Sequence, residues 1–141
     1  MKFNIVIAPW PEVAAQSRTV RNDVFVTEQN IPLELEWDGI DPVCIHALAI
    51  DNGGNAIGTA RLLSDGYIGR VAVLAAWRSR GVGRAILEAL IQEARRRGYA
   101  KAMLNAQSYA IGFYAKSGFE VAGDEYCEAG IPHVPMVRTL R

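Results

Sequence analysis

The stretch RVAVLAAWRSRGVGRAILEAL, residues 70–90, decides the fold of this chain, because it joins a strand, a glycine-rich turn and a helix. Residues 67–74 are rich in small and β-branched side chains, which is typical of a strand. Residues 80–98 carry apolar side chains at three- and four-residue spacing, which predicts the longest helix of the chain. The apolar stripe of this helix comprises Ile86, Leu87, Leu90, Ile91 and Ala94.

The mouth of this helix is suited to an anion. The first amides of a helix have no partner within it and carry partial positive charge, so together they can hold a phosphate. Gly81 and Gly83 lack a Cβ, which lets an anion approach the backbone. The arginines that add positive charge beside them are Arg78, Arg80 and Arg84.

Three interpretations of the two glycines compete. A Rossmann dinucleotide site requires a third glycine, where this chain has Ile86. An ATP P-loop requires Lys and then Ser or Thr after the last glycine, where this chain has Arg84 and Ala85. The third alternative is an ordinary loop-to-helix turn with surface arginines, and the glycines alone do not exclude it.

The rest of the chain predicts an α+β fold with a largely antiparallel sheet. A helix between strands 67–74 and 101–107 indicates a parallel crossover within a mixed sheet. The other expected elements are a strand at 3–8, a helix at 11–27, a loop with one short helical turn at 30–42, strands at 44–50 and 56–64, a helix at 108–118 opened by Ser108 as N-cap, and a final strand pair.

Bulk composition limits the function classes. The 141 residues predict one domain, 1–141, and 15 basic against 15 acidic residues exclude a binder of nucleic acid by net charge. No apolar run approaches the ~20 residues of a membrane helix, and we expect no membrane partner and no signal peptide. Cys44 and Cys127 form no CxxC pair, so we expect reduced thiols, a cytoplasmic protein and no metal site.

Two ordered motifs resemble the GNAT superfamily of N-acetyltransferases. The string RVAVLAAWRSRGVGRAIL resembles the acyl-CoA motif of that family, in which a strand valine precedes [QR]-x-x-G-x-G and a long helix. The residues that match it in order are Val73, Arg78, Gly81 and Gly83. The second string, LNAQSYAIGFYAKSGF at 104–119, resembles the family's N-x-x-A-x-x-F-Y-x-x-x-G-F signature in a slightly longer variant. Its matching residues are Asn105, Phe113, Tyr114, Gly118 and Phe119.

A narrower likeness concerns the flanking segments. RNDVFVTEQNIPLELEWDGIDPVCIHALA and EAGIPHVPMVRTL resemble a subset of small, single-domain bacterial members whose physiological substrates are often unassigned. The resemblance implies a mixed, largely antiparallel central sheet of six to seven strands flanked by helices. It places the acyl-CoA site between the two central parallel strands.

The resemblance also implies roles for individual residues. Acetyl-CoA would be the co-substrate, and an amide near Val73 would stabilise the thioester oxygen. Tyr114 would be the general acid that protonates the departing thiolate, because a phenol is protonated at neutral pH. Without the resemblance, Tyr114 reads as a packing aromatic. The residues expected to bind the cofactor are Val71, Ala72, Val73, Arg78, Ser79, Arg80, Gly81, Val82, Gly83, Arg84, Asn105 and Phe113.

The general base is left open by the sequence. Strand 67–74 has Arg70 and no carboxylate, although some family members carry a Glu there. A water chain is one alternative, and the candidate side chains are Glu28, Asp38, Asp41, His46 and His133. Glu28 and Asp38 are our predicted acceptor-side residues, whereas the neighbouring acids Glu34 and Glu36 are expected to serve solubility.

The sequence therefore predicts an N-acetyltransferase that moves an acetyl group from acetyl-CoA to a primary amine of a small molecule or peptide. Use of a longer acyl-CoA is the alternative among enzymes. A CoA-binding regulatory or catalytically inactive module is the alternative of another class. Many relatives are dimers, and no exposed stripe in the sequence decides between a monomer and a homodimer.

Overall fold

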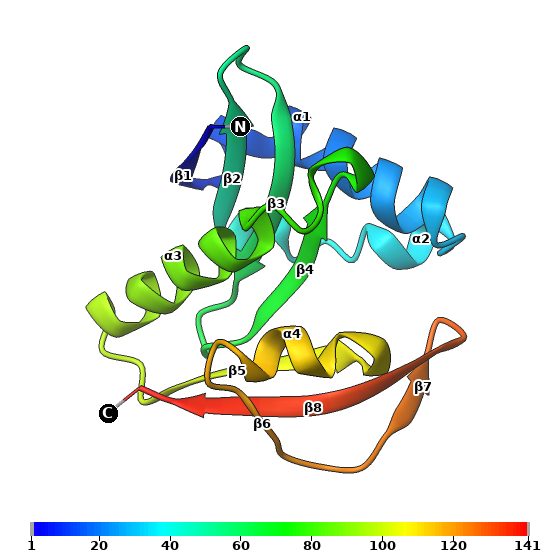
Figure 1. Cartoon of the computed structure of the whole chain (residues 1–141), viewed down its shortest axis with the longest axis vertical. Helices are drawn as coiled ribbons and strands as arrows, with labels where there is room; N and C mark the ends of the chain where they lie inside the picture. The colour runs from blue at the N-terminus through cyan, green and yellow to red at the C-terminus, as the bar shows by residue number, and fades with distance from the viewer. Residues whose placement is uncertain (1, 141) are drawn as a thin grey trace.

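A computed structural model describes residues 2–140 of the chain (Figure 1). The strands are β1 (Phe3–Pro9), β2 (Ile45–Asp51), β3 (Ala56–Leu62), β4 (Ile68–Val73), β5 (Lys101–Gln107), β6 (Glu120–Val121), β7 (Tyr126–Glu128) and β8 (Ile131–Thr139). The α-helices are α1 (Trp10–Arg21), α2 (Leu33–Glu36), α3 (Val82–Arg96) and α4 (Ile111–Ala115). A π-helix, η1 (Asn22–Glu28), continues α1, and the 3-10 turns are η2 (Asp41–Val43), η3 (Ala75–Trp77) and η4 (Ser108–Ala110).

The strands form two four-stranded sheets, whereas the sequence led us to expect one sheet of six to seven strands. The first sheet has the order β1-β2-β3-β4, and the second joins β5, β6 and β7 through β8. The two sheets meet at one parallel bridge between Tyr67 and Met103, where the Met103 amide donates to the Gly66 carbonyl at 3.0 Å. Beyond that bridge β4 and β5 diverge, so the expected parallel neighbours are confirmed but the sheet is split between them (Figure 1).

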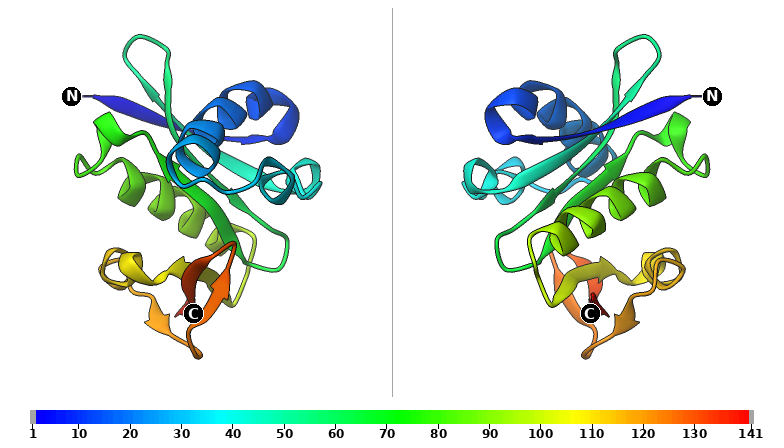
Figure 2. Two further views of the ribbon diagram at one scale, coloured as in Figure 1. Left: turned by 90° about the vertical axis from the view of Figure 1, so that its right-hand side faces the viewer. Right: turned by 90° about the vertical axis from the view of Figure 1, so that its left-hand side faces the viewer.

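The two long helices cover opposite faces of the first sheet (Figure 2). The predicted apolar stripe of α3 is confirmed, since all five of its residues are fully buried in the main core. Along β2, Ala47 and Ala49 face that core, while Leu48 packs on the other side with Trp10 and Val13 of α1. This alternation follows from the two-residue period of a strand.

The segment before the loop is not one regular helix. The predicted helix 11–27 is α1 followed by the π-helix η1, which ends with the Gln29 amide bonded to the Val24 carbonyl at 3.0 Å. Apolar spacing indicates which residues are buried. It does not distinguish an α-helix from a short π-helix, because both place similarly spaced residues on one face. Val24 and Phe25 of η1 are buried against Ala72, so the π-helix packs on the part of β4 that lies beyond the bridge between the sheets.

The prediction that Ser108 caps the helix 108–118 is wrong. Ser108 begins a 3-10 turn, and its hydroxyl donates to the Glu125 carboxylate at 2.8 Å instead of to a backbone group of a helix. The α-helix itself covers only Ile111–Ala115, with Ala110 at its N-cap. The sequence predicted a final pair of strands, but the structure has three strands there, because β6 and β7 both pair with β8. Among residues 2–140, no helix has the length and apolar character to cross a membrane.

Candidate active site

The divergence of β4 and β5 opens a cleft of about 620 Å³ between the two sheets. Its β4 wall includes Val71, Ala72 and Val73, and its β5 wall includes Asn105 and Gln107. The facing edges of these strands have backbone groups that no neighbouring strand uses. The Leu74 amide donates to the Ile57 carbonyl of β3 at 2.9 Å, so strand alternation places the Val73 amide on the opposite edge, toward the cleft.

A bulge in β4 lies at the centre of this wall. The pairing of β3 with β4 shifts register between Thr59 and Arg61, and Arg70 adopts a left-handed φ of 53°. Non-glycine residues rarely adopt this conformation, and a bulge bends its strand and increases the local twist. Such conformations cluster at functional sites, and here the bulge turns β4 away from β5.

The mouth of α3 follows Arg78, which lines the cleft, whereas residues 79–84 are not part of the cleft lining. This mouth has the open geometry expected of an anion site. Gly81 is the N-cap of α3 with a left-handed φ of 85°, and a Cβ placed there would have nothing within 4 Å. Gly83 is closely packed instead, because a Cβ there would lie 3.1 Å from Cζ of Phe113 and 3.5 Å from Val73. The two glycines therefore serve different purposes: one permits the turn and the other permits close contact with α4.

The arginines at this mouth do not share one environment. Arg78 lies against β4, where its Nε donates to the Val73 carbonyl at 3.0 Å. Its terminal nitrogens donate to the two oxygens of Glu28 at 2.5 and 2.6 Å. Arg80 lies over the Trp77 ring, 5.8 Å from its centroid. Arg84 lies in the first turn of α3.

Glu28 is thus fully paired with Arg78. The hydrogen bonds from Arg78 lower the pKa of Glu28, and those to Glu28 raise the pKa of Arg78. Only Arg78 of this pair lines the cleft. The pair links the end of η1 to the edge of β4.

Tyr114 lines the cleft from α4. Its ring meets Phe113 and Phe119 edge-on, at centroid distances of 5.0 and 6.3 Å. Burial raises the pKa of Tyr114 above its usual value, so the phenol keeps its proton at neutral pH. Asn105 lines the same cleft from β5, whereas Phe113 lies beside Gly83 at the mouth of α3.

Asp38 lies outside the cleft lining, in a network of six charged side chains. Its carboxylate accepts from Arg61 at 2.5 and 3.0 Å and from Arg70 at 3.3 Å, and the bonds from Arg61 hold its pKa well below the usual range. The remaining ion pairs of the network join Arg21 to Glu36 and Asp41, Arg61 to Asp41, and Arg70 to Glu36. Three arginines balance three carboxylates, so the network is neutral and anchors the segment that carries Glu36, Asp38 and Asp41.

The two histidines have different environments. His46 is buried under the Trp10 ring, its Nε2 bonds to the Asp41 carbonyl at 3.0 Å, and burial lowers its pKa. His133 lines the cleft from β8. Among residues 2–140, no group of three or more histidine, cysteine or acidic side chains is arranged to hold a metal ion.

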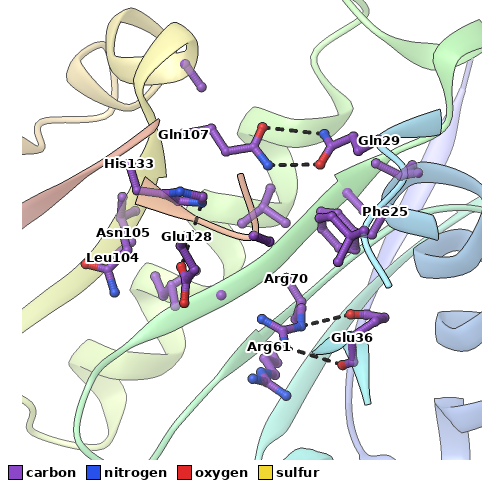
Figure 3. Close-up of a pocket in the computed structure, with 18 of the residues that line it drawn as sticks. Phe25, Gln29, Glu36, Arg61, Arg70, Leu104, Asn105, Gln107, Glu128 and His133 are labelled. Atoms are coloured by element: carbon purple, nitrogen blue, oxygen red, sulfur yellow. Dashed lines mark hydrogen bonds and ion pairs between the residues drawn. The ribbon is translucent and has the colours of Figure 1, made fainter. Parts of the chain in front are cut away.

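Several cleft residues were not predicted from the sequence, and the polar ones among them include Gln29, Gln107, Tyr109 and Glu128. The amides of Gln29 and Gln107 form a reciprocal pair, at 2.9 and 3.4 Å, that crosses from η1 to β5 (Figure 3). Gln107 lies two positions after Asn105, so strand alternation could have placed it on the same wall. The other three depend on chain packing, and we find no sequence signal for them.

Comparison with known proteins agrees with this architecture. The acetyltransferase (GNAT) domain family matches residues 44–140. The chain is 39% identical over 137 residues to the uncharacterised N-acetyltransferase YjcF of Bacillus subtilis, which covers 94% of this chain and 97% of that protein. The structure of an acyl-CoA N-acyltransferase from Pseudomonas aeruginosa matches with a TM-score of 0.86 and 29% identity, over 98% of this chain and 100% of that one. Escherichia coli ElaA matches with a TM-score of 0.87 and 27% identity, over 97% and 99% of the two chains.

The family match covers more than half of the chain and includes β4, the mouth of α3, β5 and α4. Of these elements, β4, β5 and α4 line the cleft, together with residues of η1, α2, β7 and β8. A fold of this family implies a CoA-based acyl donor and an acceptor substrate. The chain belongs to the GNAT acetyltransferase family and is an acyltransferase.

Proposed function

We propose that this protein transfers the acetyl group of acetyl-CoA to a primary amine of a small molecule or peptide, by direct attack of the amine on the thioester. The observation that carries the proposal is the cleft between β4 and β5, which Arg78 lines just before the mouth of α3 and Tyr114 lines from α4. Its wall presents an unpaired strand edge, which is the kind of surface that an extended chain such as pantetheine can pair with.

Binding of the donor follows from the arrangement of the two ends of this wall. Backbone amides from Ser79 to Arg84 would hold the pyrophosphate at the helix mouth, where Gly81 leaves open space. The edges of Val71, Ala72 and Val73 would pair with the pantetheine, and Asn105 would bond to it from β5. Phe113 would support the site by packing on Gly83. Acetyl-CoA supplies the activated thioester, and all other groups in the proposal come from this chain.

The chemistry would use two donors from this chain. The Val73 amide would donate to the thioester oxygen as negative charge develops there. Removal of one such donor typically lowers kcat by about 10²- to 10³-fold. Tyr114 would give its proton to the departing sulfur. The raised pKa of Tyr114 supports this role, because it keeps the phenol in the donating form.

Glu28 and Asp38 remain our proposed acceptor-side residues. We propose that they act indirectly, through the ion pairs that they form with arginines. The Glu28–Arg78 pair holds the end of η1 at the edge of β4, and the Asp38–Arg61 pair holds the loop after α2 against β3. They would shape the acceptor entrance instead of contacting the amine. The free thiols of Cys44 and Cys127 support a cytoplasmic location.

The test combines donor binding with turnover. Acetyl-CoA should raise the melting temperature of the purified protein, and a panel of primary amines should release free CoA thiol. Longer acyl-CoA esters in the same assay test the donor preference. Stabilisation by acetyl-CoA without thiol release across the panel would favour the CoA-binding module. If no CoA ester stabilises the protein, the assignment of the cleft to CoA is wrong.

A further inference from the structure

We infer that His133, assisted by Glu128, is the general base that removes a proton from the acceptor ammonium. This inference rests on the proposed function, because it assigns the one chemical role that the cleft would still lack. His133 lies on β8, and its side chain faces the cleft between β4 and β5 beside Glu128 (Figure 3).

The hydrogen bonds of His133 determine which ring nitrogen is basic. Its Nδ1 lies 2.7 Å from the Ile131 carbonyl oxygen, which can only accept a hydrogen bond. Nδ1 therefore carries the proton of the neutral ring, and Nε2 keeps a free lone pair. A histidine whose tautomer is fixed in this way is prepared to accept a proton at one defined atom.

Glu128 is placed to stabilise the proton once it has been accepted. Its Oε2 lies 3.8 Å from His133 Nε2, which is too long for a hydrogen bond to the neutral ring but suits attraction to an imidazolium. The side chain of Glu128 is 63% exposed, whereas that of His133 is 11% exposed. The exposed carboxylate therefore connects the buried ring to solvent, where the proton can leave.

A tight turn holds the two residues together. Ala129 and Gly130 both have left-handed φ values, 53° and 75°, between β7 and β8. Two consecutive residues of this kind are the mark of a type I′ hairpin turn. The Tyr126 ring stacks on His133 at a centroid distance of 5.9 Å and limits its rotation. The hairpin thus presents the carboxylate and the imidazole to the cleft as a pair.

The charges around His133 are consistent with this role. The titratable neighbours are Glu128 and Tyr126 from β7, and Tyr67 and Arg70 line the cleft from the β4 side. Arg70 is already paired with Glu36 at 3.0 Å and with Asp38 at 3.3 Å. Glu128 is therefore the carboxylate of this cleft that has no arginine partner among the described ion pairs, and it would also attract a cationic amine.

The proton balance of the step is complete. Nε2 of His133 takes one proton from the ammonium, which leaves the nitrogen lone pair free to form the new C–N bond. The electrons of the thioester C=O move to oxygen and then return as the C–S bond breaks. Tyr114 gives its proton to the sulfur and regains one from the nitrogen of the tetrahedral species. The imidazolium passes its proton to solvent, so the products are an amide, free CoA thiol and one proton.

The deciding variant is His133→Asn, because an asparagine amide can keep the hydrogen bond to the Ile131 carbonyl without supplying a base. The substrates are an alkylamine that the wild-type protein accepts and its fluorinated analogue, ethylamine and trifluoroethylamine being the simplest pair. Fluorine makes the amine largely neutral at neutral pH, so it has no ammonium proton to lose. We expect kcat/KM to fall about 10²- to 10⁴-fold for the alkylamine but less than about tenfold for the fluorinated amine.

A second variant tests the role of the carboxylate. Glu128→Gln removes the negative charge that stabilises the imidazolium, so the acidic limb of the pH–rate profile should move to lower pH. Glu120→Gln, which changes an exposed carboxylate of β6, is the matched control and should leave the profile unchanged. A merely structural role of Glu128 would change the rate without moving the limb.

The outcomes separate the two proposals. Acetyl-CoA affinity measured by calorimetry should be retained in His133→Asn. An equal loss for both amines, or no loss for either, would overturn the role of His133 while the acetyltransferase proposal stands. A wild-type protein that binds acetyl-CoA and releases no thiol with any amine would overturn the proposed function itself.

Discussion

Glu28 accepts hydrogen bonds from both terminal nitrogens of Arg78, at 2.5 and 2.6 Å, across 50 residues of sequence. The same guanidinium donates from Nε to the Val73 carbonyl on the edge of β4 at 3.0 Å. One side chain therefore connects the end of the π-helix η1 to the strand that would bind the acyl donor. Both partners are about two-fifths exposed, so the pair positions these segments more than it stabilises the fold.

Glu28→Gln should lower acetyl-CoA affinity by less than about tenfold, because it breaks this link. Arg78→Gln should lower it at least as much, because it also removes the bond to the Val73 carbonyl. The free energy of unfolding should change by no more than about 1 kcal/mol, as expected of an exposed ion pair. Titration calorimetry and urea unfolding measure the two effects. Asp23→Asn, on the same π-helix, is the control. A higher KM for the amine with unchanged acetyl-CoA affinity would instead place Glu28 in contact with the acceptor.

Tyr114→Phe should lower kcat while leaving acetyl-CoA affinity nearly unchanged, because only the proton donor is lost. General acid catalysis typically contributes 10²–10⁴-fold, and we expect a loss toward the lower end because water can substitute in part. Steady-state kinetics and calorimetry provide the comparison, with Tyr99→Phe outside the cleft as control. Unchanged turnover would remove Tyr114 as the general acid.

Gly81→Ala should cost about 1–2 kcal/mol of unfolding free energy, because alanine is strained at the left-handed φ of 85°. Gly54→Ala is a close match, since Gly54 has a φ of 83° and a Cβ placed there would also have nothing within 4 Å, but it lies in the β2–β3 turn. The two variants should lose similar stability, and only Gly81→Ala should weaken acetyl-CoA binding. Equal affinities in both variants would show that the mouth of α3 does not hold the donor.

Arg21→Met should destabilise the protein by about 3–5 kcal/mol, because it leaves Glu36 and Asp41 buried with fewer cationic partners. Arg18→Met is the control, since Arg18 lies over the same two rings, Trp10 and Trp37, without a described ion pair. Its cost should stay near 1 kcal/mol. Urea unfolding of both variants measures the loss of unfolding free energy. Similar losses would mean that Arg21 contributes ring stacking and not charge pairing.

His46 should make stability depend on pH below neutrality. Burial lowers its pKa from the ordinary value of 6.5, so the unfolded chain takes up a proton first as the pH falls. Its stabilisation is present above about pH 6.5 and is lost as the pH falls toward the folded value, with a slope of at most about 1.4 kcal/mol per pH unit. His46→Gln should flatten this decline in urea unfolding between about pH 7.5 and pH 5.5, whereas His133→Asn should retain it. A decline of equal slope in His46→Gln would assign it to other groups.

Much of the fold could be predicted because its signals are local. The apolar stripe of α3, the β2–β3–β4 meander and the strand 101–107 each appear as a periodic pattern within about twenty residues. The errors lie where two local structures share a pattern. Spacing did not separate the π-helix from α1, and Ser108 resembles an N-cap although its hydroxyl is bonded to Glu125.

The candidate site also divides into residues with a local sequence signal and residues that only packing brings together. The glycines at the mouth of α3 and the aromatic pair of α4 are recognisable in order along the chain, so the donor side of the cleft could be predicted as a hypothesis. The arrangement of the remaining cleft walls could not, because their residues come from η1, β5, β7 and β8 and meet only in space. Glu128 carries no pattern of its own, and its proximity to His133 depends on the turn at Ala129 and Gly130.

The sequence by itself determined the fold class, the long helix with its open mouth and the family to which the chain belongs. Periodicity and motif spacing record short-range geometry, and that geometry is set by the backbone within each element. Only the tertiary structure decided that the sheet divides between β4 and β5, that Glu28 and Asp38 are held by arginines, and that His133 rather than His46 faces the cleft. These outcomes depend on which distant charges and strand edges find a partner when the core closes, and no single segment contains that information.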